Sequence, residues 1–301
     1  MPSAETITFY VGLKEVPNAK APGILHAIET VMDEKDEHWK GKLISTGTDG
    51  ASVMIGRRGG VVAMLQAQVP HVIGIHCVAH KLELHVAFAD TVKSSEVMKQ
   101  VKEVLTACWK HYRYVYSAKV VRELKELADA MEVNVGKPTK ADGTRWVPHF
   151  LRAIEGLAGK HYKVIVAHFA HTAQANDSSA EMQGRAENVH NKKSSYSFLQ
   201  YLHLLWDIAF EISKVSLVFQ RNEVAVSDVK HELDRVDLAL QNMTRRGGRH
   251  LQSFQEKVGD GVVFQDVNLK RAENDTEMFA GNREDILNDS RGFLKVSALL
   301  F

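Results

Sequence analysis

The stretch GTDGASVMIGRRGG, from Gly47 to Gly60, directly follows a short apolar segment that predicts a strand, Leu43–Thr46. Asp49 stands in this stretch between small residues, just after the predicted strand ends. A carboxylate in this position lies at the carboxyl edge of a sheet, where the active sites of α/β folds gather. It predicts either a ligand for a divalent metal or a turn aspartate that accepts hydrogen bonds from nearby backbone amides.

On both sides of this stretch the sequence alternates between β-rich and helical segments. Strands are predicted at Ile7–Leu13, Leu43–Thr46 and Val72–Ile75, and helices at Ile24–Trp39 and Gly60–Gln68. Because such an alternation needs crossover connections, it predicts an α/β fold with a partly parallel, mixed sheet.

After His76 the apolar period becomes almost purely helical. Helices are predicted at Trp146–Ala170, Phe198–Phe219 and Val224–Met243, whereas Gln174–Ser197 is polar and predicts a flexible loop. These changes divide the chain into an α/β core at residues 1–93, an all-helical domain at 94–245 and a polar tail at 246–301.

The composition excludes several classes of protein. Of the 301 residues, 45% are hydrophobic, which is enough for a sizeable core, and the formal net charge is +1. A polyanionic ligand such as nucleic acid would therefore have to bind at a local basic patch. The only cysteines are Cys77 and Cys108, so the chain suits a reducing compartment rather than a disulfide scaffold. No signal peptide or membrane-spanning segment is predicted.

The segment HCVAHKLELH begins at His76 and places Cys77 and His80 three residues apart, on one face of a predicted helix start. His76, Cys77, His80 and His85 as a fourth candidate suggest zinc, but a structural zinc site needs four ligands and no second Cys/His pair stands at finger spacing. A packed, hydrogen-bonded Cys/His pair near the sheet edge is the other interpretation.

Two further motifs carry basic residues. Arg57 and Arg58 stand in a glycine-flanked run that either contacts a nucleic-acid backbone or forms a solvated turn. The run lacks the Gly-Lys-Ser/Thr ending of a phosphate-binding loop. Arg145 and Trp146 open a predicted helix, where the indole either stacks on an unpaired base or anchors the core.

Two weaker features remain. The basic runs NKK, at residues 191–193, and RRGGR, at residues 245–249, could contact phosphate, although short charge clusters usually form solvated surface. Asp207 and Glu211 lie four residues apart on one helix face, as a metal-binding pair would. Because Lys214 follows them, a solvated helix face is the preferred interpretation.

Taken in order, TDGASVMIGRRGGV, PHVIGIHCVAHKLEL and GTRWVPH resemble motifs of the hAT superfamily of DNA transposases. They are more closely similar to its vertebrate host-gene derivatives, the zinc-finger-protein-862-like group. The resemblance covers Phe9–Ala170 well and the remainder loosely. It implies a partial RNase H-like fold with a mixed sheet in residues 1–93, followed by a mostly α-helical insertion domain.

The resemblance also implies roles for individual residues. Enzymes of this family hold two divalent metals with a D-D-E triad, and Asp49 matches the second Asp. Cys77 and His80 match the C-x-x-H motif, and Arg145 and Trp146 match the R-W motif, whose Trp lies near a flipped base. The first Asp would lie upstream of the ITFYVGL segment, and neither it nor the last Glu is identified in this chain.

We therefore expect a catalytically inactive, transposase-derived protein that acts through nucleic-acid or protein binding and needs no cofactor. One alternative is a metal-dependent transposase or nuclease that works only within a longer chain and then uses Mg²⁺ or Mn²⁺. Another is a protein-interaction module that binds no nucleic acid. The expected partners are DNA, another protein or a second copy, but not a membrane. The resemblance implies a nuclear location, and without it the cytoplasm is expected.

Overall fold

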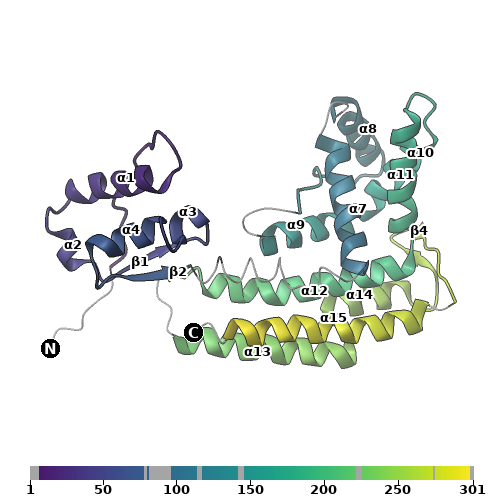
Figure 1. The fold of residues 1–301 in the computed structure, drawn as a ribbon. Helices are drawn as coiled ribbons and strands as arrows, with labels where there is room; N and C mark the ends of the chain where they lie inside the picture. Colours follow the sequence, from purple (N-terminus) through teal and green to yellow (C-terminus); the bar gives the residue numbers. More distant parts are fainter. Residues whose placement is uncertain are drawn as a thin grey trace. The chain divides into compact units, whose positions relative to one another are not determined.

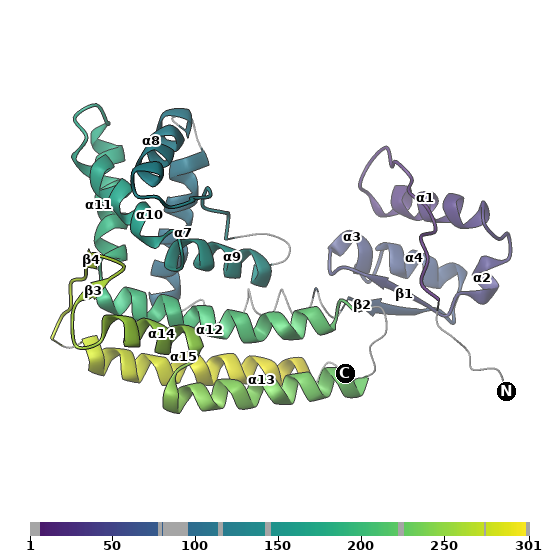
Figure 2. The same cartoon turned by 180° about the vertical axis from the view of Figure 1, so that it is seen from behind.

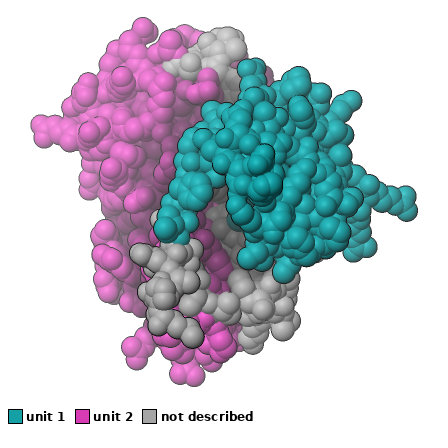
Figure 3. All heavy atoms as spheres, turned by 90° about the vertical axis from the view of Figure 1, so that its left-hand side faces the viewer, with its two compact units in different colours: residues 1–82 teal, residues 83–301 magenta. Residues whose placement is uncertain are grey.

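A computed structural model describes residues 7–77, 80, 96–113, 117–141, 146–221, 226–273 and 275–298. The chain forms two compact units, residues 1–82 and 83–301, which Figure 3 shows in different colours. The sequence predicted the first boundary at residue 93, which lies outside the described residues. An α/β start followed by a helical remainder agrees with the predicted class of fold.

The first unit is a two-stranded parallel sheet with helices. Its elements are α1 (Ala21–Asp33), α2 (Trp39–Lys42), β1 (Ser45–Thr48), α3 (Ser52–Ile55), α4 (Val61–Gln68) and β2 (Ile73–His76). The strands pair in register from Ser45 opposite Ile73 to Thr48 opposite His76. Both ribbon views show α1 and α4 on the same side of this sheet (Figures 1 and 2).

A small apolar core holds these elements together. It consists of Ala21, Leu25, Trp39, Val61, Leu65, Val69 and Val72. The one polar atom of the buried Trp39 side chain, Nε1, donates a hydrogen bond of 2.7 Å to Asp33. The opposite face of the sheet is open, since Ile73 and Ile75 are 59% and 47% exposed.

The prediction of a strand at Ile7–Leu13 is wrong. This segment has no regular secondary structure, and the side chains of Phe9 and Leu13 are exposed. Its course explains why: a Cβ on Gly12 would lie 2.6 Å from Val31 Cγ1, so the chain here crosses closely over α1. A β-rich sequence forms a strand only where a neighbouring strand pairs with it.

The second unit, where the structure describes it, is helical apart from one short hairpin. It contains α7 (Glu96–Arg113), α8 (Ser117–Ala130), α9 (Trp146–Ala158), α10 (Tyr162–Gln174), α11 (Ala180–Lys193), α12 (Tyr196–Val218), α13 (Val226–Arg246), α14 (Arg249–Val258), β3 (Val263–Phe264), β4 (Val267–Asn268) and α15 (Asp275–Ala298). In α12, 17 of 23 residues are buried, and the helix packs against α9, α13, α14 and α15. It is therefore the central element of this unit. No helix in the described part of the chain is long and apolar enough to cross a membrane.

Two other expectations differ from the structure. The segment Gln174–Ser197, predicted to be a flexible loop, contains the helix α11, in which Ala186, Val189 and Lys193 are buried. The hydroxyl of Ser179 caps this helix by accepting a hydrogen bond from the Met182 amide. The predicted polar tail from residue 246 contains α14, the hairpin and α15. Since α14 packs on α12, and α15 packs on α12 and α13, this segment is part of the folded unit.

Lys193 is an unusual member of the core, with a relative exposure of 0%. Its Nζ donates a hydrogen bond of 2.6 Å to the Leu157 carbonyl and lies 5.2 Å from the centre of the Tyr162 ring. Burial lowers the pKa of Lys193 to about 8, and the nearby Cys108 thiol opposes part of this shift. The structure thus holds an ammonium group where water cannot solvate it.

This burial makes a prediction for Lys193→Met. Between pH 8 and 10 the unfolded chain binds a proton at this lysine that the folded chain has lost. The contribution of Lys193 to the free energy of unfolding therefore rises with pH. From about pH 7.5 to about pH 9.5 the free energy of unfolding of the native chain should rise by roughly 2 kcal/mol relative to the variant. Urea unfolding of both chains measures this difference, with Lys160→Met at an exposed position as control. Parallel pH profiles for the native chain and Lys193→Met would contradict it.

Candidate functional site

The carboxyl edge of the β1–β2 sheet brings together the TDG motif, which contains Asp49, and the HCxxH motif, which contains Cys77. Because the strands are parallel, their carboxyl ends meet: Asp49 follows β1, and Cys77 follows β2. The Cys77 amide donates a hydrogen bond of 2.7 Å to the Thr48 carbonyl, which continues the ladder by one residue. The TDG and HCxxH motifs, far apart in sequence, are therefore neighbours in space.

Gly50 allows this close approach. A Cβ at this position would lie 2.6 Å from both Cε1 and Nε2 of His76, so the imidazole packs directly on the glycine backbone. The His80 ring is next to it, with its centre 5.9 Å from that of His76. A side chain larger than hydrogen at Gly50 would displace the His76 ring, which explains why glycine follows Asp49 here.

Asp49 itself is exposed, and its Oδ1 accepts a hydrogen bond of 3.1 Å from the Ala51 amide. This is the hydrogen bond that the turn interpretation of Asp49 predicts. The same carboxylate remains open to solvent, so a cation could still approach it. The geometry therefore agrees with a turn aspartate, and the metal role that the resemblance implies for Asp49 stays a prediction.

A metal ion needs more donors than Asp49 alone supplies. Among the residues that the structure describes, no group of three or more His, Cys, Asp or Glu side chains is arranged to hold a metal. This holds also for His76, Cys77 and His80, of which Cys77 is exposed. The zinc interpretation of the HCxxH motif thus lacks the fourth ligand that it requires within the described part of the chain.

The arginine pair lies on the turn between α3 and α4. Both Arg57 and Arg58 are exposed, and the Gly60 amide closes the turn with a hydrogen bond of 2.8 Å to the Gly56 carbonyl. A Cβ on Gly60 would lie 2.4 Å from the Gly56 nitrogen, so this tight turn also requires glycine. The arrangement places two guanidinium groups in solvent, as both interpretations of the motif require.

The R-W motif is only partly visible. Arg145 lies outside the described residues, and so does the side chain of Trp146, whose backbone begins α9. The predicted contact of this pair with nucleic acid stays a prediction.

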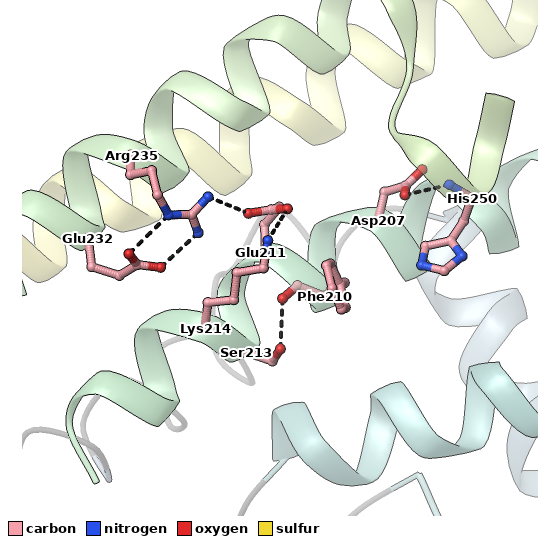
Figure 4. A network of polar contacts seen from close by, with 8 residues as sticks. All are labelled: Asp207, Phe210, Glu211, Ser213, Lys214, Glu232, Arg235 and His250. Atoms are coloured by element: carbon pink, nitrogen blue, oxygen red, sulfur yellow. Dashed lines mark hydrogen bonds and ion pairs between the residues drawn. The ribbon is translucent and has the colours of Figure 1, made fainter. Parts of the chain in front are cut away.

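The structure makes Asp207 and Glu211, on α12, part of a buried polar site (Figure 4). Asp207 is 2% exposed, and its carboxylate accepts hydrogen bonds from the amides of His250, at 2.8 Å, and Leu251, at 3.0 Å. These amides belong to the first turn of α14, so Asp207 caps that helix from another element. Burial, aided by the nearby Glu211, raises the pKa of Asp207 to about 6 against the lowering effect of both amides.

The surroundings of Asp207 tighten this cap. Gly248, which precedes α14, packs so closely that a Cβ there would lie 2.2 Å from Asp207 Cγ. Next to it, the rings of Trp206 and His250 stack with their centres 3.9 Å apart and their planes at 9°. The site thus joins α12 and α14 through polar and aromatic contacts.

Glu211, one turn further along α12, is neutralised by cations. Its carboxylate lies 3.0 Å from Arg235 Nη1 and accepts a hydrogen bond of 2.7 Å from Lys214 Nζ. Arg235 also donates two hydrogen bonds to Glu232 on its own helix, and its ion pair with Glu211 ties α12 to α13 (Figure 4). The two acids of α12 are therefore used for packing between helices.

The interpretation of Asp207 and Glu211 as a solvated helix face is wrong, because α13 and α14 cover that face. The signal for their burial is present in the sequence. The run FLQYLHLLWDIAFEI is apolar on every side of the helix, which is typical of a helix surrounded by protein. Polar residues within such a helix need internal partners.

Comparisons with family models and with solved structures identify no relative of this chain. No protein-family model matches the chain, and no solved structure has significant similarity to it.

Proposed function

We propose that this chain derives from a hAT-superfamily transposase and acts by binding nucleic acid or protein rather than by cutting DNA. In this proposal the first unit is part of an RNase H-like domain, and Asp49 is the remaining second carboxylate of the triad. The observation that carries it is the parallel β1–β2 pair, which brings Asp49 and the Cys77–His80 motif to one sheet edge.

The donor set around Asp49 supports the proposed loss of catalysis. Two-metal strand cleavage needs several carboxylates about two metal ions that lie about 4 Å apart. Within the described residues Asp49 joins no such group, and it already accepts a hydrogen bond from the Ala51 amide. A single exposed carboxylate holds Mg²⁺ or Mn²⁺ weakly.

Calorimetric titration of the native chain and of Asp49→Ala with MgCl₂ or MnCl₂ tests this part. We expect both chains to bind metal more weakly than about 1 mM, with no difference between them. Asp260→Ala, which removes an exposed carboxylate from the other unit, is the matched control. Sub-millimolar binding that Asp49→Ala loses and Asp260→Ala keeps would instead support the enzyme alternative, in which further carboxylates complete the site.

For the binding role, the exposed Arg57 and Arg58 are the best-placed described candidates for phosphate contacts, with Arg145 and Trp146 added by the family resemblance. A nuclear location would follow from such a role. The near-neutral net charge and the exposed isoleucines of the open sheet face favour the second candidate, a protein-interaction module. Titration of duplex DNA at several salt concentrations separates the two, because phosphate contacts give a steep loss of affinity with salt.

A further inference from the structure

A groove with a volume of about 720 Å³ lies between α7, α10 and α11, within the second unit. On α7 its lining residues recur at helical spacing from Met98 to His111, so they form one continuous face of the helix. At 1.5 Å per residue this face is about 20 Å long. From α11 the groove is lined by Met182, Arg185 and Val189, three residues on one face of that helix.

The floor of the groove is apolar. Its residues are Met98, Ala107, Phe169, Met182 and Val189. Met98, Phe169 and Val189 are almost fully buried, so the accessible apolar surface comes mainly from Ala107 and the half-buried Met182, whose unbranched side chain adapts to different shapes. Such a surface accepts aliphatic side chains and offers little to a phosphate backbone, which is held by cations and hydrogen-bond donors.

The rim is cationic on both walls. Lys99, Lys102 and Lys110 line it from α7 and Arg185 from α11, against the single acid Glu103. His111 adds no charge at neutral pH, because burial and the nearby Arg185 lower its pKa to about 4. Glu96 and Glu181 pair with Lys99 and Arg185 at the edge of this rim, so the excess of positive charge becomes larger when a ligand takes the place of these two acids.

The ion pairs along the rim are easily exchanged. Lys99 Nζ lies 3.8 Å from Glu96 Oε2, and Arg185 Nη1 lies 2.9 Å from Glu181 Oε1. The side chains of both pairs are exposed. Exposed pairs of this kind contribute roughly 0–1 kcal/mol each. An acidic ligand can therefore replace these partners at small cost.

The spacing of the cations selects among anionic ligands. Lys99 and Lys110 are eleven residues apart on α7, which corresponds to about 17 Å. A small anion can contact only one end of this row. An extended ligand with carboxylates along its length and aliphatic side chains toward the floor can use all of it, and an amphipathic helix has this form.

We propose that the groove between α7 and α11 binds an acidic amphipathic helix of a protein partner, with its apolar face on the floor and its carboxylates against the lysine and arginine rim. The proposal names a partner for the binding role inferred above and rests on that role. It uses only residues of the second unit, so the metal titration of Asp49→Ala can fail without affecting it.

Fluorescence polarisation with a labelled synthetic peptide tests the proposal on the full chain. The probe is a peptide of about 16 residues with leucine on one helical face and glutamate elsewhere. A peptide of the same composition with its leucines scattered around the helix is compared with it, together with a single-stranded oligonucleotide. We expect the amphipathic peptide to bind with a dissociation constant below about 100 μM, and the scattered peptide to bind at least tenfold more weakly.

Three variants separate the contributions. Lys110→Glu/Arg185→Glu reverses one charge on each wall, and Ala107→Phe fills the floor without changing charge. Both should weaken binding of the amphipathic peptide by about tenfold or more. Lys125→Glu, at an exposed position on α8, is the matched charge control and should leave affinity unchanged. Thermal unfolding of each variant followed by circular dichroism verifies that it is folded.

Three outcomes would overturn the proposal. Equal affinity for both peptides would show charge attraction without recognition of a helix. Tight binding of the oligonucleotide alone, lost in Lys110→Glu/Arg185→Glu, would make the groove a nucleic-acid site. Unchanged peptide affinity in a folded Ala107→Phe variant would place the peptide elsewhere on the chain.

Discussion

Replacing Asp207 with alanine is expected to lower the free energy of unfolding by about 3 kcal/mol, one of the largest effects of any single substitution proposed for this chain. The variant leaves the amides of His250 and Leu251 without their acceptor at a buried helix end. Each unsatisfied buried amide costs about 1–3 kcal/mol, and water can enter only partly because Gly248 closes the site. Urea unfolding followed by circular dichroism at 222 nm measures the loss.

The pH dependence of this loss identifies its source. Asp207 has a folded pKa of about 6, above that of an ordinary aspartate. A raised carboxyl pKa means that the contribution of Asp207 to stability falls as pH rises from about 4 to above 6. The difference between native chain and Asp207→Ala should therefore be roughly 1 kcal/mol larger at pH 5 than at pH 7. Asp234→Ala, at an exposed position on α13, should show neither effect.

The second large effect is expected for Gly248→Ala. The added methyl would lie 2.2 Å from Asp207 Cγ and 2.5 Å from its Oδ2, far inside van der Waals contact. The carboxylate must then move away from the α14 amides, so the variant should lose about 2–4 kcal/mol of stability by overpacking and by loss of the cap. Gly184→Ala, in α11, is a control because a Cβ there meets nothing within 4 Å.

A double-mutant cycle distinguishes this mechanism from simple backbone strain. In Asp207→Ala the side chain that Gly248→Ala would strike is absent, so the second substitution should cost less than about 1 kcal/mol there. The two losses should thus be strongly non-additive. Additive losses would show that Gly248 acts through its own backbone and that the contact with Asp207 is incidental.

The local elements of the first unit could be predicted well from the sequence. The apolar run after Pro70 corresponds to β2, and the helix predicted from Gly60 corresponds to α4. The strand predicted at Leu43–Thr46 overlaps β1, which begins at Ser45 and continues through Gly47 to Thr48. The helix α4 follows Gly60 and ends before Pro70, so local preferences decide where it begins and ends. The parallel pairing followed from the helix that separates the strands.

Features that depend on distant partners could not be predicted in the same way. Ile7–Leu13 has the composition of a strand but lacks a pairing partner in the described chain. The segment that forms α11 reads as polar because most of its residues face solvent, whereas its burial depends on the neighbouring helices. At the candidate site, the residue order predicted that Asp49 lies at a strand end. The contact of His76 with Gly50 depended on the register of two strands.

The central position of α12 has a consequence for how the protein is made. A ribosome completes α12 before it has synthesised α13, α14 and α15, which cover much of its surface. A nascent chain at that stage presents leucine, tyrosine and tryptophan side chains to solvent, and Asp207 has no amides to cap. Vectorial synthesis therefore leaves an aggregation-prone intermediate that lasts until α15 emerges, and general chaperones that bind exposed apolar helices are expected to protect it.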